Sequence, residues 1–214
     1  MRSLGILGGT FDPVHFGHLR LALEMNERLG LSDGVRLVPA REPALRGTPG
    51  TTPATRMEML CAAVAGSDVL SVDDRELRRG GISYTVDTLE SLRSELPTAS
   101  ISFIVGMDAF ARFHRWHRWR DIIGLAHIAV AKRPGAKFSD DPRLASFIAE
   151  HVVKEPTRLA QSKAGHVCLL DTPLMEVSAT YVRNLVFEHR SPRYLVPEAV
   201  AQLIERHGAY RGNE

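Results

Sequence analysis

Short apolar runs alternate with amphipathic stretches along most of the chain. The run SLGILGG at 3–9 is stopped by glycines, which is typical of a buried parallel strand. Residues 18–30 follow with the apolar spacing of a helix, and Gly30 fits a C-cap. The same pattern predicts strands at 35–40, 69–74, 100–106, 127–135 and 166–172, and helices at 55–66, 85–97, 179–189 and 197–207. The alternation indicates an α/β fold with a doubly wound, mostly parallel sheet and helices on both faces.

Three segments break this alternation. Residues 41–55 are rich in Pro, Gly and Thr and predict a long loop, of a length that is usually functional or mobile. An aromatic and basic stretch covers 107–121, where His114 and His117 are expected on the surface. Residues 136–165 are the least regular part of the chain and indicate a surface excursion.

The ends of the predicted strands carry the most unusual sequence. Five polar or glycine-rich features follow strands, at 8–18, 41–55, 106–108, 132–133 and 178–183. Ligands of doubly wound sheets bind beyond the carboxyl ends of the strands, where the strand order reverses. This shared position predicts a nucleotide-type site. The opening TRMEML of the helix at 55–66, by contrast, indicates an ordinary amphipathic helix.

Composition narrows the class of protein. The chain has 214 residues, 44% hydrophobic and 24% charged, which favours a single domain over 1–214. Its net charge of +2 does not indicate a nucleic-acid partner, and no apolar run has the length of a membrane span. Cys61 and Cys168 lie far apart in apolar stretches, which predicts buried thiols in a cytoplasmic protein.

The turn GGTFDPVHFGH at 8–18 is the first candidate for chemistry. It is neither a Walker A loop nor a GxGxxG fingerprint, but Gly8 and Gly9 let a ligand approach the backbone at the start of a helix. His15 and His18 are three residues apart and share a face of that helix. A metal site needs a third ligand, and none stands out nearby. Helix capping or packing is the ordinary alternative, and phosphate binding is favoured by the glycines beside the histidines.

The segment SATYVR at 178–183 predicts a second anion site. Ser178 fits an N-cap, Thr180 lies in the first turn, and Arg183 follows about one turn later. On its own, the segment would be an ordinary capped helix with a surface arginine. Paired with the first turn, it suits a polyphosphate, so that C-terminal helices over about 178–210 complete the phosphate site.

Together these segments resemble a known superfamily. GGTFDPVHFGH and SATYVR are similar to the HxGH turn and the ISSTxxR-like helix start of the nucleotidyltransferases, which have a Rossmann-like fold. SYTVDT at 83–88, FIVGMDAFARFHRW at 103–116 and KRPG at 132–135 resemble the bacterial nicotinate mononucleotide adenylyltransferase family. The resemblance implies transfer of an adenylyl group from ATP to nicotinate mononucleotide, giving deamido-NAD and pyrophosphate in NAD biosynthesis.

The resemblance also implies roles for individual residues. His15, His18 and Arg183 would be the catalytic groups, acting on the phosphates with Mg²⁺ carried by ATP and no metal site on the protein. The residues implied to bind ATP are Gly8, Gly9, Thr10, Phe11, His18, Gly106, Asp108, Ser178, Thr180 and Arg183. Thr85 and Trp116 would hold nicotinate, with the indole stacked on the pyridine ring, and Arg46 and Arg133 would complete the mononucleotide site.

One segment departs from the family pattern, and other functions stay open. Where the family has a sequence like PPHK, this chain has PALR at 43–46, so Leu45 replaces a histidine and Arg46 alone keeps a cation. A sister enzyme that adenylylates phosphopantetheine is one alternative. A non-catalytic nucleotide- or RNA-binding module is another, because Trp116 lies in a basic and aromatic stretch. The expected partners are small molecules, not nucleic acid or membrane, and the protein is expected to be a monomer or a homodimer.

Overall fold

The central element is a parallel sheet. The computed structural model describes residues 1–45, 47–132, 141–173 and 175–212. These residues form a seven-stranded sheet in the order β4 (Leu70–Val72), β2 (Val35–Pro39), β1 (Ser3–Gly9), β6 (Ser100–Gly106), β7 (His127–Lys132), β9 (Val167–Asp171) and β8 (Val152–Val153). Every neighbouring pair is parallel. The predicted doubly wound fold is therefore confirmed, and the strand order reverses between β1 and β6.

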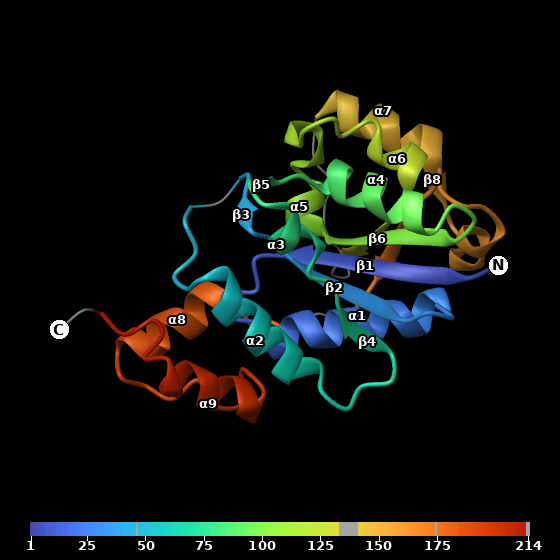
Figure 1. Ribbon diagram of the computed structural model, residues 1–214. Coiled ribbons are helices and arrows are strands. Elements are labelled where there is room, and N and C mark those ends of the chain that lie inside the picture. Colours follow the sequence, from blue (N-terminus) through green and yellow to red (C-terminus); the bar gives the residue numbers. More distant parts are fainter. Residues whose placement is uncertain (46, 133–140, 174, 213–214) are drawn as a thin grey trace.

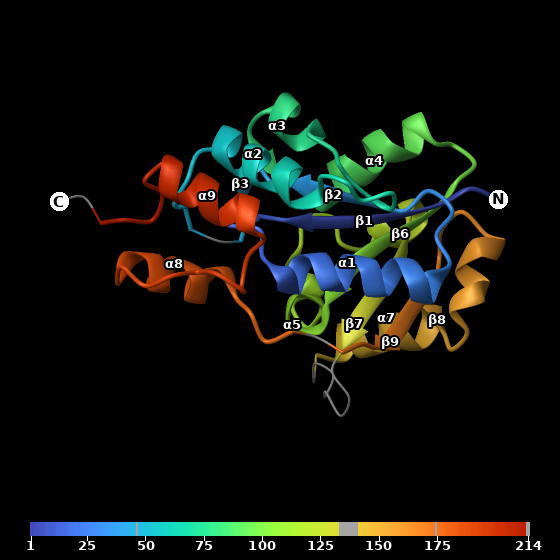
Figure 2. The ribbon, with the colours of Figure 1, turned by 90° about the horizontal axis from the view of Figure 1, so that it is seen from below.

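Helices cover both faces of this sheet (Figures 1 and 2). The core on one face includes residues of α1 (Phe16–Leu29), α2 (Pro53–Val64), α8 (Ala179–Phe187) and α9 (Glu198–Arg206), and α9 packs against α2. The other face packs against α4 (Thr85–Glu95), α5 (Met107–Phe110), α6 (Ile122–Leu125) and α7 (Pro142–His151). Neighbouring strand residues alternate between the two cores, as Phe103 and Ile104 do. No helix within the described ranges is long and apolar enough to cross a membrane.

Short elements structure the predicted 41–55 loop and its surroundings. β3 (Glu42–Pro43) pairs with β5 (Ile82–Ser83) in a small second sheet, and α3 (Arg75–Arg79) precedes β5. α2 begins at Pro53, two residues earlier than predicted, because the Thr52 hydroxyl accepts a hydrogen bond from the Thr55 N–H at 3.1 Å. The loop is thus tied at both ends.

The prediction of an irregular excursion at 136–165 was wrong for its larger part. α7 and β8 lie there, and so does the 3₁₀ helix η2 (Pro156–Gln161). Asp141 caps α7 by accepting a backbone N–H of the first turn at 2.9 Å, and the proline that follows is preorganised for a helix start. Asp141 also lies 3.4 Å from the ring of His114, whose side chain is 9% exposed, so His114 is not the surface residue expected.

Candidate active site

The reversal of strand order places glycine-rich backbone at one edge of the sheet. β1 and β6 are neighbours, so Gly8 and Gly106 end up at the same edge, and Asp108 lies exposed just beyond it. A Cβ atom added to Gly106 would meet no described atom within 4 Å, and one added to Gly8 would only touch the Phe103 ring at 3.8 Å. Internal packing therefore does not require these two glycines. They leave backbone open to a ligand.

The turn after β1 is built around Phe11. Its backbone has φ of 50°, and its ring folds back over Gly9, where an added Cβ would come within 3.0 Å of the ring. Phe11 is 1% exposed, and its ring meets that of His18 edge-on with centroids 5.0 Å apart. Gly9 and Phe11 therefore shape the turn from inside, while Thr10 is half-buried between them.

The two histidines of the HxGH turn form one stacked pair. His15 is the N-cap of α1, and its ring stacks on that of His18 with centroids 3.7 Å apart. The His15 backbone N–H donates to His18 Nδ1 at 3.4 Å, so a neutral His18 carries its proton on Nε2. A Cβ at Gly17 would lie 3.0 Å from His15 Nδ1. The glycine of the motif thus makes room for the first imidazole.

His15 is a neutral hydrogen-bonding group. The residue is buried, and burial lowers the pKa of its imidazole to about 4. Its Nδ1 atom is buried and finds no hydrogen-bond partner in the described part of the chain. Buried polar atoms without a partner are rare in proteins, and a bound ligand is one way to satisfy them. At neutral pH this imidazole therefore offers a hydrogen bond without a positive charge.

The second predicted anion site lies directly beside the first. Ser178 caps α8 by accepting the Tyr181 N–H at 3.1 Å, and Ser178 and Thr180 are both exposed. The Val177 carbonyl lies 3.4 Å from the position of a Cβ on Gly17, so the two helix starts adjoin. Arg183 then crosses to the first turn, where its Nη1 donates to the Asp12 carbonyl at 2.7 Å. The structure brings the two segments together.

A buried arginine that the sequence analysis passed over braces this turn. Arg56 of α2 is fully buried, and burial lowers the pKa of its guanidinium. Nη1 donates to the carbonyls of Thr10 and Ala40 at 2.8 and 2.6 Å. TRMEML does lie in a helix with one buried face, as predicted, but the buried Arg56 on that face makes it more than an ordinary amphipathic helix. A signal was present, because Arg56 shares the helix face of the buried Met59 and Leu60.

The predicted acceptor residues come from two neighbouring segments. Thr85 is the first residue of α4, and the preceding Tyr84 ring lies 4.5 Å from the ring of the exposed His117. This contact brings SYTVDT beside the aromatic stretch. Trp116 is half-buried and meets the Phe103 ring edge-on at 5.8 Å, so part of its indole is used in packing. This position is compatible with stacking on nicotinate and with a place in a basic and aromatic surface for nucleic acid, the two roles considered from the sequence.

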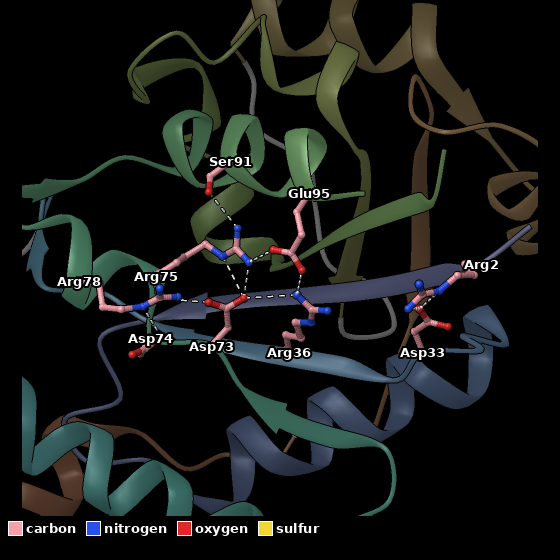
Figure 3. A network of polar contacts seen from close by, with 9 residues as sticks. All are labelled: Arg2, Asp33, Arg36, Asp73, Asp74, Arg75, Arg78, Ser91 and Glu95. Carbon is pink, nitrogen blue, oxygen red and sulfur yellow. Dashed lines mark hydrogen bonds and ion pairs between the residues drawn. The ribbon is translucent and has the colours of Figure 1, made fainter. Parts of the chain in front are cut away.

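A polar network holds the SYTVDT segment in place. Glu76 of α3 is buried and accepts a hydrogen bond from the Thr88 hydroxyl, and burial raises the pKa of this carboxyl group. Figure 3 shows Arg75, the first residue of α3, between the carboxylates of Asp73 and Glu95, with Nη2 to oxygen distances of 2.6 and 2.7 Å. Arg36 of β2 reaches the same two carboxylates at 3.5 and 3.1 Å. The sheet edge, α3 and α4 are thereby fixed to one another.

Comparison with known proteins decides between the families considered. The cytidylyltransferase-like family model matches residues 6–185. A protein of Marinobacter nauticus named "Probable nicotinate-nucleotide adenylyltransferase" is 47% identical over 206 residues, covering 96% of this chain and 95% of its own. One of the same name from Pseudomonas entomophila is 45% identical and covers 100% and 97%. The chain belongs to the nicotinate-nucleotide adenylyltransferase family.

Solved structures agree on the fold of this family. The Plasmodium falciparum nicotinic acid mononucleotide adenylyltransferase complexed with NaAD superposes with a TM-score of 0.74, at 15% identity and 98% coverage of both chains. A second structure of that enzyme, complexed with APC, gives a TM-score of 0.71 at the same coverage. The Rossmann-like nucleotidyltransferase fold expected from the sequence is confirmed.

The departure from the family pattern lies at the edge of the site. Leu45, which the resemblance described above implies replaces a histidine, is 63% exposed. The loop around it is fixed at its start, because the Arg41 N–H donates to the Ser83 hydroxyl at 2.9 Å. Arg46 and Arg133, both predicted to contact the mononucleotide, lie outside the described residues.

The residue types at this site suit phosphate oxygens and hydroxyl groups. Among the residues that the structure describes, no group of three or more His, Cys, Asp or Glu side chains is placed to hold a metal ion. What the edge of the sheet offers are glycine backbone, imidazoles, hydroxyls and a guanidinium. These groups are of the kinds that bind phosphate oxygens and hydroxyl groups in proteins.

Proposed function

We propose that this protein transfers the adenylyl group of ATP to nicotinate mononucleotide, releasing pyrophosphate and deamido-NAD for NAD biosynthesis. The observation that carries the proposal is the meeting of the HxGH turn and SATYVR, with residues 40 and 41 joining Gly9 of the first turn to Ser83 of the SYTVDT segment. Relatives that match almost the full length and carry the name of this reaction support it.

The reaction needs no covalent enzyme intermediate. A 5′-phosphate oxygen of the mononucleotide attacks the α-phosphorus of ATP, a P–O–P bond forms, and the bond from the α-phosphorus to the leaving pyrophosphate breaks. The nucleophile is already an anion, so no general base is needed. Catalysis then comes from alignment and from stabilising charge on the phosphates. ATP enters as its magnesium complex, in keeping with the preference of Mg²⁺ for phosphate and water ligands.

The ATP half of the site lies between β1, β6 and α8. His15 and His18 donate hydrogen bonds to phosphate oxygens, the first as a neutral imidazole. Arg183 supplies the positive charge that the neutral His15 does not. The other residues proposed to contact ATP are Gly8, Gly9, Thr10 and Phe11 of the first turn, Gly106 and Asp108 at the adenosine, and Ser178 and Thr180 at the phosphates.

The mononucleotide half lies between α4 and the aromatic stretch. Trp116 presents an indole face to the pyridine ring, and the Thr85 hydroxyl or its backbone N–H donates to the nicotinate carboxylate. Arg46 and Arg133 supply further positive charge, Arg46 in place of the family histidine. A site made of donors disfavours the amide substrate, whose NH₂ group would meet other donors at a cost of about 1–3 kcal/mol.

Domain organisation, compartment and oligomeric state complete the proposal. We infer that residues 1–214 work as one domain in the cytoplasm, as a monomer or a homodimer, on small molecules alone. Both cysteines are free thiols, which agrees with a reducing compartment. Cys168 is buried, and burial raises its pKa to about 11, whereas Cys61 is exposed, so the prediction that both are buried was wrong for Cys61.

Pyrophosphate release with ATP and a panel of acceptors tests the function. Nicotinate mononucleotide should give a kcat/KM roughly 10- to 100-fold above that of its amide counterpart, and well above that of phosphopantetheine. Equal or better turnover of phosphopantetheine would identify the sister enzyme instead. Nucleotide binding with no pyrophosphate from any acceptor would favour the binding module.

A further inference from the structure

The end of the chain reaches back to the first turn. Tyr210 follows α9 with φ of 64°, and its hydroxyl donates to the Asp12 carboxylate at 2.8 Å across 198 residues of sequence. Its ring packs against Gly50, where an added Cβ would lie 3.2 Å from the ring. Figure 1 shows α8 and α9 near the side of the sheet toward which β1 runs.

The Asp12 carboxylate joins three segments of the chain through hydrogen bonds. The side chain is buried, with the residue only 4% exposed. One oxygen accepts the Gly50 N–H at 2.7 Å, and the other accepts the hydroxyls of Thr51 and Tyr210, each at 2.8 Å. The first turn, the loop before α2 and the end of the chain are therefore held by a single side chain.

The same residue sets the position of Arg183. The guanidinium donates to the Asp12 carbonyl at 2.7 Å, and its Nη1 lies 3.9 Å from the Asp12 carboxylate. Nη2 donates to the Thr180 hydroxyl at 3.3 Å, within the same helix. Within the described part of the chain, Asp12 is the residue of the first turn that these contacts join to this guanidinium, so a shift of Asp12 is expected to turn Arg183 relative to the histidines.

We propose that Tyr210 is a positioning residue for adenylyl transfer, which fixes Asp12 and, through Asp12, the guanidinium of Arg183. This inference rests on the proposed function and on the role proposed there for Arg183. Burial raises the pKa of the Tyr210 hydroxyl, so the phenol remains a hydrogen-bond donor throughout the usual assay range. A loosened Arg183 would stabilise the departing pyrophosphate less well, and the loss would appear in kcat.

Tyr210→Phe isolates the hydrogen bond, because the ring that packs on Gly50 is retained. We expect kcat to fall about tenfold, with KM for nicotinate mononucleotide within about twofold of wild type. Tyr194→Phe is the matched control, since Tyr194 also has a positive φ of 65° but is 90% exposed. The control should keep the wild-type kcat.

A double variant separates positioning from simple stabilisation. In an Arg183→Lys background, which lacks the guanidinium, Tyr210→Phe should lower kcat by less than about twofold further. The same tenfold loss in both backgrounds, or an unchanged kcat in the Tyr210→Phe single variant, would overturn the proposal. Wild-type protein that makes no deamido-NAD in this assay would instead overturn the proposed function.

Discussion

Two buried histidines at opposite edges of the sheet have the same shifted pKa and different surroundings. His15 lies at the carboxyl edge and His127 at the amino edge, and burial lowers the pKa of each to about 4. His127 Nε2 is paired with the Ser162 carbonyl at 2.9 Å, and its Nδ1 accepts the His166 N–H at 3.2 Å. His15 Nδ1 has no such partner within the described residues.

The difference extends to the rest of the two edges. At the amino edge, Arg93 donates to the carbonyls of Leu96, Ala99 and Leu125 at 2.6 to 3.1 Å, so loop backbone is closed off by protein groups. At the carboxyl edge, Gly106 leaves room that no described atom fills. A shifted pKa alone therefore does not mark a site. A shifted pKa together with a buried polar atom that lacks a hydrogen-bond partner does indicate a site.

Substituting each histidine by asparagine should separate the two edges most strongly. His15→Asn should lower kcat by roughly 10²–10³, the effect of removing one transition-state donor, with little change in Tm. His127→Asn should leave kcat of the folded enzyme unchanged and lower Tm by several degrees, because a buried hydrogen bond is lost. Steady-state kinetics and thermal unfolding check both, and an exchange of these two outcomes would refute the comparison.

Trp116→Ala should raise KM for nicotinate mononucleotide by roughly 10–100-fold, since stacking on a base contributes about 1–3 kcal/mol. KM for ATP should stay within about twofold. Trp119→Ala is the matched control, because Trp119 packs on Phe113 and Phe147 and holds Arg120 over its ring at 4.6 Å. Both variants should lower Tm. If both also raised KM for the mononucleotide, Trp116 would be a packing residue only.

Gly17→Ala should lower kcat about tenfold. Its Cβ would lie 3.0 Å from His15 Nδ1 and displace the stacked imidazoles. Gly124→Ala provides the comparison at a helical glycine whose added Cβ meets no described atom within 4 Å. That variant should keep its kcat and gain about 0.5–1 kcal/mol of stability. A Gly17→Ala enzyme with full kcat would contradict the account of the motif.

The last comparison concerns the dependence of stability on pH. The unfolded histidines titrate near 6.5 and the folded ones near 4, so the unfolded state binds more protons between these values. The free energy of unfolding should therefore fall as pH drops from about 6.5 to about 4, by up to roughly 3 kcal/mol for each histidine. Denaturant titrations of wild type and His127→Asn should show a flatter dependence in the variant.

The local sequence pattern predicted most of the strands and helices, but few of the long-range side-chain hydrogen bonds that hold them together. The predicted strands at 3–9 and 100–106 match the structure, because a buried parallel strand consists of consecutive apolar residues that the sequence shows directly. α7 was not predicted, although Asp141 followed by Pro142 is a typical helix start. Its buried face is narrow, because only Leu144 and Phe147 of the helix are buried. Asp12 and Tyr210 are joined by one hydrogen bond over 198 residues, a pairing that no local spacing encodes.

The most direct test of the central claim is a ¹⁵N spectrum of the histidine rings with a non-hydrolysable ATP analogue and Mg²⁺. Resonances would be assigned with the His15→Asn and His127→Asn variants. We predict that the His15 and His18 ring nitrogens shift on binding, while those of His127 stay within the spectral error. Shifts at His127 with none at His15 would place the nucleotide away from the carboxyl edge and contradict the account.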